Sequence, residues 1–179
     1  MRAIPLAAAL TGVTAALALT ACGGGDGGGG DANAKSDASG KSSACSLQQV
    51  GVDVGPANAA PAAGDTGNIP VTVTNTGSGA CTLDGFPGVD LRAGGTSWTL
   101  APEEGAKAQK LTLHQDEAAT FTLTYVRGEA GSGAAVRTLR ISLPGHTGDK
   151  QWKWPYGDVA EKSADELDAT VSTFRTAGD

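Results

Sequence analysis

The three cysteines are the residues of this sequence whose chemistry can best be inferred from their surroundings. Cys22 ends an uncharged apolar run and is followed at once by seven glycines in eight residues. Cys45 and Cys81 lie instead among residues typical of a folded domain. A thiol can carry a covalent lipid, form a disulfide, bind a metal or act as a nucleophile. The surroundings of each cysteine decide between these roles.

Cys22 follows a segment with the features of a secretory signal peptide. Met1-Arg2 is a short basic start, and residues 3–21 are uncharged and rich in Ala and Leu. The run is less apolar than a spanning helix, which needs about 20 apolar residues. Leu19-Thr20-Ala21-Cys22 resembles the bacterial lipobox, which implies cleavage before Cys22 and a diacylglyceryl group on its thiol, with acyl chains such as palmitate. An ordinary secreted chain and an uncleaved anchor are the alternatives.

The segment after Cys22 is expected to be a flexible linker. Residues 23–44 contain no side chain more apolar than alanine, so they cannot bury a core. A linker of this length has a root-mean-square reach of about 25 Å. We therefore expect a lipid-anchored linker over residues 22–44 and a folded head outside the cell, attached to the membrane. Apart from the covalent lipid, no cofactor is expected.

Once Cys22 carries lipid, Cys45 and Cys81 remain as an even pair in an oxidising compartment. A disulfide between them would stabilise the head by roughly 4 kcal/mol in the chain-entropy model. A metal site and a reactive thiol are the alternatives. A metal site would need further ligands, and the sequence has only His114 and His146 and no C-x-x-C spacing.

The other polar residues give weak signals for catalysis. His114 lies on the polar side of an expected strand and His146 in a turn, so we expect both at the surface. The acid pairs Glu103-Glu104 and Asp116-Glu117 lie beside expected turns and are typical of a solvated surface. The sequence has no nucleophile elbow, EF-hand loop, phosphate loop or H-E-x-x-H motif. We expect no catalytic residues and no metal; a hydrolytic or metal-dependent enzyme with a site on its loops is the alternative.

Three aromatic residues are concentrated in the run Gln151–Tyr156. In an extended strand Trp152, Trp154 and Tyr156 would share one face. Such a face could stack on sugar rings or bind a partner, which suggests an envelope protein or a cell-wall glycan. The alternative is that these rings close one end of the core. Pro155 favours an edge strand, which leaves the binding role open.

Strands with one buried side are expected to position these residues. Apolar residues alternate with polar ones along most of the chain after Ser46, which predicts β-strands. The alternating apolar positions are Val50, Val52, Val54; Ile69, Val71, Val73; Cys81, Leu83; Val89, Leu91; Trp98, Leu100; Leu111, Leu113; Phe121, Leu123, Tyr125; and Leu139, Ile141, Leu143. Expected turns at 75–77, 84–85, 94–95, 127–128 and 144–145 leave no room for crossover helices. The pattern predicts an antiparallel sandwich or barrel.

Three segments are harder to interpret. Residues 55–68 are rich in Ala, Pro and Gly, and we expect an exposed loop. Asn75–Gly79 is expected to turn tightly, because Asn and Gly tolerate positive φ. In the tail, residues 158–179, Ser163–Glu166 could be a helix capping box with Leu167, Val171 and Phe174 at helical spacing. A last strand over 170–175 is the alternative, and we favour it.

The charge of the chain argues against nucleic-acid binding, and its length indicates a single folded domain. The formal net charge of the chain is −6, and no basic stripe is present. Nucleic-acid binding depends on Lys and Arg neutralising phosphates, so a nucleic-acid partner is not expected. After removal of signal and linker, enough chain remains for one domain with a substantial core.

Residues around the two head cysteines resemble a known family. Cys45-Ser46-Leu47, residues 71–77 (VTVTNTG) and residues 80–91 (ACTLDGFPGVDL) are similar to the bacterial domain of unknown function 4232, over roughly residues 45–145. The resemblance implies an all-β, immunoglobulin-like head, an antiparallel β-sandwich of Greek-key type, with a Cys45–Cys81 bridge. It brings no catalytic or ligand-binding residues. The expected function is a non-catalytic binding or envelope-associated module, with its head over residues 45–157; a structural protein that contacts the cell wall is another alternative.

Overall fold

The computed structural model describes residues 43–58 and 60–178. These residues form strands, turns and loops only, so the all-β prediction is confirmed. Among the described residues there is no helical segment that could span a bilayer. The expected signal peptide, Cys22 and nearly all of the linker lie outside the described residues. The strands are β1 (Ser43–Ala44), β2 (Val50–Val54), β3 (Thr66–Asn75), β4 (Cys81–Gly85), β5 (Gly88–Ala93), β6 (Thr96–Thr99), β7 (Ala101–Pro102), β8 (Gln109–Leu113), β9 (Ala118–Val126), β10 (Thr138–Ser142), β11 (Asp149–Lys153), β12 (Glu161–Ser163), β13 (Glu166–Leu167), β14 (Ala169–Val171) and β15 (Arg175–Thr176).

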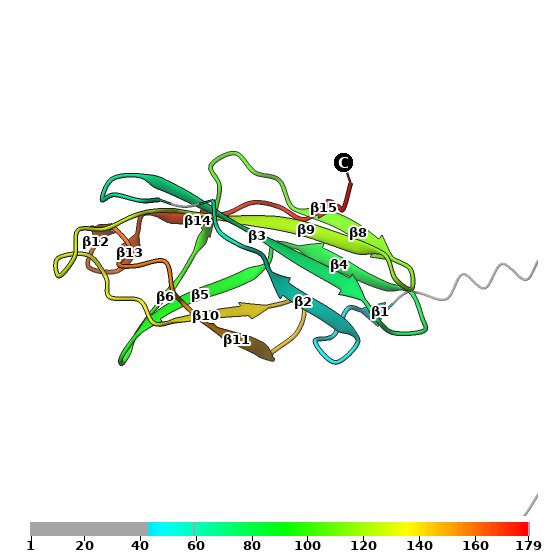
Figure 1. The fold of residues 1–179 in the computed structure, drawn as a ribbon. Coiled ribbons are helices and arrows are strands. Elements are labelled where there is room, and N and C mark those ends of the chain that lie inside the picture. The colour runs from blue at the N-terminus through cyan, green and yellow to red at the C-terminus, as the bar shows by residue number, and fades with distance from the viewer. Residues whose placement is uncertain (1–42, 59, 179) are drawn as a thin grey trace, which may run out of the picture. The chain divides into compact units, whose positions relative to one another are not determined.

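The strands form several sheets that are mainly antiparallel (Figure 1). The largest has the order β2-β3-β9-β14-β7, with β15 also paired to β9. A second sheet has the order β11-β10-β5-β6, a third β1-β4-β8, and β12 pairs with β13. Two short pairs, β1 with β4 and β7 with β14, are parallel. Each joins segments far apart in sequence, as parallel pairing requires.

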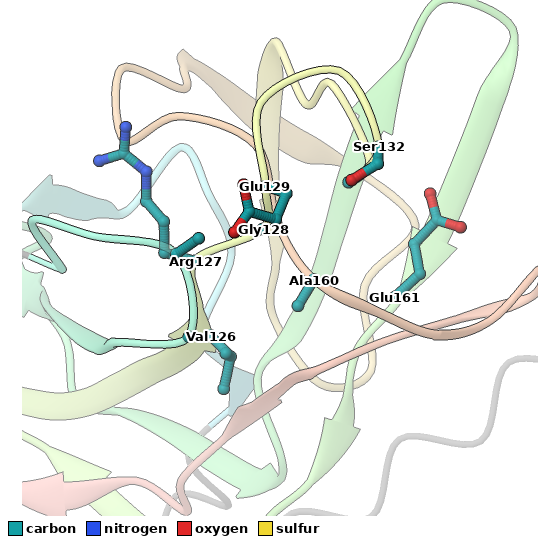
Figure 2. A pocket seen from close by; sticks show the side chains of 10 residues that line it. Val126, Arg127, Gly128, Glu129, Ser132, Ala160 and Glu161 are labelled. Atoms are coloured by element: carbon teal, nitrogen blue, oxygen red, sulfur yellow. The ribbon is translucent and has the colours of Figure 1, made fainter.

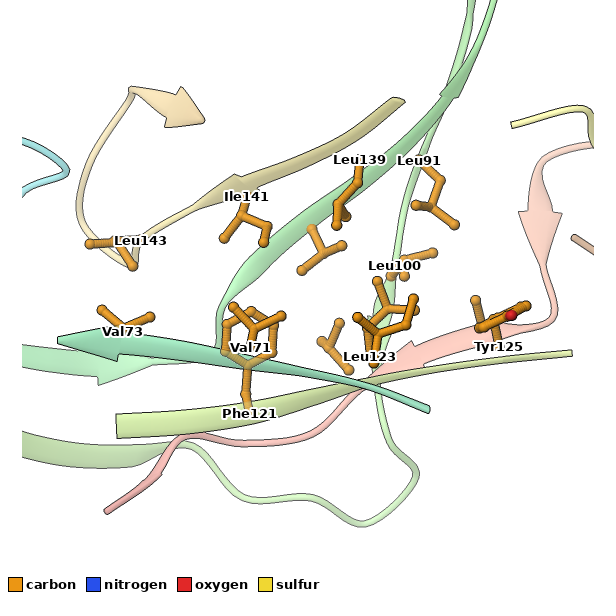
Figure 3. Packing of buried hydrophobic residues seen from close by; sticks show 14 of the residues in the cluster. Val71, Val73, Leu91, Leu100, Phe121, Leu123, Tyr125, Leu139, Ile141 and Leu143 are labelled. Atoms are coloured by element: carbon orange, nitrogen blue, oxygen red, sulfur yellow. The ribbon is translucent and has the colours of Figure 1, made fainter. Parts of the chain in front are cut away.

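The core lies between β3 and β9 on one side and β5 and β10 on the other. Figure 3 shows the apolar side chains of the two layers pointing toward one another. On each strand alternate residues are buried, which is the expected consequence of the two-residue side-chain period. The buried residues of these strands are Ile69, Val71, Val73, Phe121, Leu123, Tyr125, Val89, Leu91, Leu139 and Ile141.

Cys45 and Cys81 form a disulfide, with their Cα atoms 4.8 Å apart. Both residues are fully buried, and the backbone N–H of Cys45 donates to the carbonyl of Thr82 at 2.9 Å. The predicted bridge is confirmed, and the metal and free-thiol alternatives do not apply to this pair. The bond fixes the start of the head to β4.

The tail is part of the same core. β14 pairs with β9, and the ring of Phe174 packs edge-on against Phe121 with centroids 5.5 Å apart. The strand interpretation is confirmed, although residues 172–174 interrupt the strand between β14 and β15; the helical alternative is wrong. Ser163–Glu166 spans a turn between β12 and β13 and does not cap a helix. The residues that follow bury alternate positions, Leu167, Ala169 and Val171, as strands do. The core therefore extends beyond residue 157.

Two local expectations need correction. Residues 55–68 are not all exposed, because β3 begins at Thr66 and both Ala60 and Gly67 are buried. Asn75 does not adopt positive φ; it ends β3 in extended conformation and is completely buried. Asn75 stabilises the expected turn through hydrogen bonds of its side chain and not through positive φ.

Candidate functional site

The aromatic run at β11 and beyond does not form one exposed face. Trp154 is 5% exposed, and its indole N–H donates to the carbonyl of Gly157 at 2.7 Å. Trp152 and Tyr156 are half-buried and also pack against the core. The ring centroid of Trp154 lies 4.9 Å from that of Tyr156 and 5.1 Å from that of Tyr125, both steeply tilted. Trp154 is therefore a core residue, whereas Trp152 and Tyr156 retain exposed surface.

Burial changes the acidity of the two tyrosines in this cluster. Loss of hydration raises the pKa of Tyr125 above its usual value, and the positive charge of nearby Arg127 opposes this only in part. Burial also raises the pKa of Tyr156. Both hydroxyls therefore stay protonated at neutral pH, and that of Tyr156 donates to the carbonyl of Gly55 at 3.5 Å.

Arg127 organises the loops next to this cluster. Its Nη1 donates to the carbonyl of Ala60 at 3.0 Å. Its backbone N–H donates to Asp65, and its carbonyl accepts from Gly64, each at 2.8 Å. The side chain also lies over Gly157, where a Cβ atom would come within 2.7 Å of the guanidinium carbon. Arg127 thus fixes the segment between β2 and β3 to the segment after Trp154.

A cavity of about 400 Å³ lies beside Arg127. Its lining combines the polar side chains of Glu129, Ser132 and Glu161 with backbone from small residues. In Figure 2 the guanidinium of Arg127 points away from Ser132 and Glu161. The lining offers hydrogen-bond acceptors to a polar ligand. Glu129, Ser132 and Glu161 are exposed.

The loop that borders the cavity packs closely on the tail. A Cβ atom on Gly128 or on Gly133 would lie 2.8 Å from the backbone of Val159. The Asp158 carboxylate accepts from the N–H of Gly131 at 3.0 Å, and its backbone carbonyl accepts from Gly128 at 2.8 Å. The carboxylate and the backbone carbonyl of Asp158 therefore hold this loop in place.

The remaining polar candidates are separate surface residues. His114 and His146 are both exposed, and His146 lies near the carbonyl of Ala44 at 3.4 Å. Glu103-Glu104 and Asp116-Glu117 are exposed too. The carboxylate of Glu117 accepts from the N–H of His114 at 2.8 Å and so stabilises a turn. Within residues 43–58 and 60–178, no group of three or more His, Cys, Asp or Glu could hold a metal ion.

The organising role of Arg127 is not evident from the sequence. The sequence pattern predicts a turn at Arg127-Gly128, whereas Arg127 forms a bridge at the end of β9 and begins a longer connection. The available signal was a lone arginine directly after the alternating run Phe121–Tyr125. Its partners, Ala60 and Gly157, are far away in sequence and cannot be read from this pattern.

Comparison with known proteins agrees with the extent of the core. A family model described as a domain of unknown function, DUF4232, matches residues 45–175. None of the curated proteins matches the chain. The family match begins at the disulfide-bonded Cys45 and extends past the expected limit at residue 145 to include β14 and the buried Phe174. The chain therefore belongs to the DUF4232 family.

Proposed function

We propose that this chain is a lipoprotein anchored to the extracytoplasmic face of the cell membrane, with a head that acts as a non-catalytic binding module. The observation that carries the proposal is the division of the cysteines. Cys22 follows Leu19-Thr20-Ala21 in a lipobox-like sequence, while Cys45 and Cys81 are joined in the head. Structural disulfides are typical of exported proteins, so the bond supports export independently of the signal-like segment.

The anchor would be a diacylglyceryl group on Cys22. Two acyl chains hold a protein at a membrane stably, whereas a single chain binds only marginally. The glycine-rich segment that follows provides a spacer between lipid and head. No further cofactor is part of the proposal.

For the head we propose an immunoglobulin-like Greek-key sandwich. Supporting this, β3 and β9 pair in one sheet, while β5 and β10 pair in the layer that faces it. After β3 the chain passes through β4 of the three-stranded sheet to β5 and β6 in the second layer. It returns to the first sheet at β7, passes through β8 of the three-stranded sheet, rejoins the first sheet at β9 and then crosses to β10. Such crossings between two antiparallel layers are typical of Greek-key folds.

A non-catalytic binding role is supported by the polar side chains of the head, because several of them hydrogen-bond to backbone and hold loops in place. Arg127, Asp158 and Asn75 all hydrogen-bond to backbone and thereby hold loops in position. The half-exposed rings of Trp152 and Tyr156 offer contact surface for an envelope protein or a cell-wall glycan. The acidic net charge makes a nucleic acid an unsuitable partner.

The proposal is tested by replacing the lipid acceptor. In the native host, Cys22→Ala should either leave the signal peptide uncleaved or release the head. An uncleaved signal peptide would increase the mass of the protein, and a released head would no longer partition into the detergent phase. The double variant Cys45→Ala/Cys81→Ala is the matched control, because it removes the two disulfide-bonded cysteines of the head and leaves the anchor intact. This variant should stay in the detergent phase. Unchanged processing and partitioning of Cys22→Ala would refute the anchor.

A further inference from the structure

The outer face of the four-stranded sheet is polar throughout. Along β5, β6, β10 and β11 the apolar residues point into the core and the alternate positions point outward. The outward side chains of the three cross-strand rows are Asp90, Arg92, Ser97, Thr99, Thr138, Arg140, Ser142, Asp149, Gln151 and Lys153. Three of them are cations and two are anions, although the chain as a whole is acidic.

One row on this face places two cations on either side of a hydroxyl. Thr138 of β10 is directly opposite Arg92 of β5 and directly opposite Lys153 of β11. On the far side of Arg92 lies Ser97 of β6. Side chains directly opposite one another in antiparallel strands have Cβ atoms about 5 Å apart. Arg92, Thr138 and Lys153 can therefore contact one small group together.

The two carboxylates on the face are already engaged elsewhere. Asp90 accepts a hydrogen bond from the hydroxyl of Thr99 at 2.6 Å. Asp149 accepts from both Nε and Nη2 of Arg140, and from Gln151 Nε2 at 3.2 Å. The pKa of Asp149 is lowered chiefly by the hydrogen bond from Arg140. Asp149 and Arg140 thus largely neutralise one another.

Arg92 and Lys153 are not hydrogen-bonded in this way, although the charge of Arg92 contributes a smaller part to the lowered pKa of Asp149. In the described part of the chain neither side chain forms an ion pair or a hydrogen bond. The Nε of Arg92 is buried and still has no hydrogen-bond acceptor. Leaving a buried donor unsatisfied is unfavourable, and an arginine is more demanding because its donors carry charge.

We propose that Arg92, Thr138 and Lys153 form a binding site for an oxyanion, either a carboxylate or a phosphate group of an envelope component. The terminal nitrogens of the planar Arg92 guanidinium, Nη1 and Nη2, are paired donors that match two oxygens of either group. The hydroxyl of Thr138 and the ammonium of Lys153 supply further donors on the same row. The inference gives the proposed binding module a ligand chemistry, and it depends on the head alone, not on the anchor.

The site is tested by titrating the full chain in a neutral detergent with inorganic phosphate and, separately, with acetate at constant ionic strength. Isothermal calorimetry should show saturable binding of at least one anion, and which one distinguishes a phosphate from a carboxylate source. Arg92→Gln should weaken binding about tenfold or more, since it removes a charge-assisted hydrogen bond. Lys153→Gln should weaken it less, and Arg92→Lys should fall between wild type and Arg92→Gln.

Lys107→Gln is the matched control, because Lys107 is an exposed lysine outside this face and its loss changes the net charge equally. Binding by Lys107→Gln should equal that of wild type. The proposal is overturned if neither anion binds saturably, or if Arg92→Gln and Lys107→Gln weaken binding to the same extent. If Arg92→Gln does not fold, Thr138→Val/Lys153→Gln takes its place with the same expectation. Cys22→Ala should no longer associate with the membrane but should bind the anion as wild type does. The two measurements therefore distinguish failure of this site from failure of the anchor.

Discussion

The side-chain amide of Asn75 donates a hydrogen bond to the backbone carbonyl of Leu113 at 2.9 Å. Asn75 ends β3 in the largest sheet, and Leu113 ends β8 in the three-stranded sheet, so this bond connects the two sheets. The same Nδ2 donates to the carbonyl of Gly79 at 2.9 Å, and Oδ1 accepts from the N–H of Gly77 at 3.0 Å. A completely buried amide is thus fully satisfied.

Replacing Asn75 with Ala should lower the free energy of unfolding by about 3 kcal/mol, because two carbonyls and one N–H lose their buried partner. Thr76→Ala is the control, since its hydroxyl makes one exposed hydrogen bond to Gln49 at 3.1 Å and should matter by less than about 1 kcal/mol. Urea denaturation of the two variants measures the difference. Equal effects would mean that Asn75 does not hold the sheets together.

Removing the disulfide with Cys45→Ala/Cys81→Ala should lower the free energy of unfolding by about 4 kcal/mol, because the bond closes a loop with a sequence separation of 36. Thermal unfolding with and without reductant gives a second measurement. Reduced wild type should unfold close to the double variant. A midpoint of wild type that is insensitive to reductant would argue against a structural bond.

Gly67→Ala should destabilise the head by about 1–3 kcal/mol through overpacking. Gly67 is opposite Tyr125 in the β3–β9 pair, and an added Cβ would clash with the tyrosine ring. Gly95→Ala is the matched control, because a Cβ there meets nothing within 4 Å. Chemical denaturation should separate the two variants clearly. If they are equally stable, Tyr125 is not packed as described.

Both tyrosines of the chain, Tyr125 and Tyr156, should titrate at higher pH in the folded protein than in the unfolded one, because burial raises each pKa. The unfolded tyrosine has a pKa of about 10. The folded state prefers the protonated form, so stability is unaffected below about pH 10 and falls as the pH rises from there through the folded pKa. Ultraviolet absorbance of tyrosinate, compared with and without urea, measures the shift. Superimposable titration curves would contradict it.

The strands with a two-residue apolar period could be predicted from sequence because burial on one side imposes that period. Ile69–Val73, Phe121–Tyr125 and Leu139–Leu143 all bury the expected residues. The tail was ambiguous because Leu167, Val171 and Phe174 satisfy helical spacing. Only pairing with β9 decides in favour of strand, and that pairing is a long-range contact.

The candidate sites were harder to predict than the strands. The spacing of Trp152, Trp154 and Tyr156 gave one shared face, but Trp154 turns inward beyond the end of β11. Arg92 and Lys153 become neighbours only through Thr138, which depends on the register of three strands. Register is set by the packed core as a whole, so local patterns in the sequence do not reveal such a row.

Intact mass spectrometry of the protein, extracted without reductant from membranes of its native host, tests the anchor and the disulfide together. We expect a chain that begins at residue 22, carries a diacylglyceryl group there, and has two hydrogens fewer than the thiol form because Cys45 and Cys81 are joined. A chain that still begins at Met1, or one with an unmodified Cys22, would contradict this expectation.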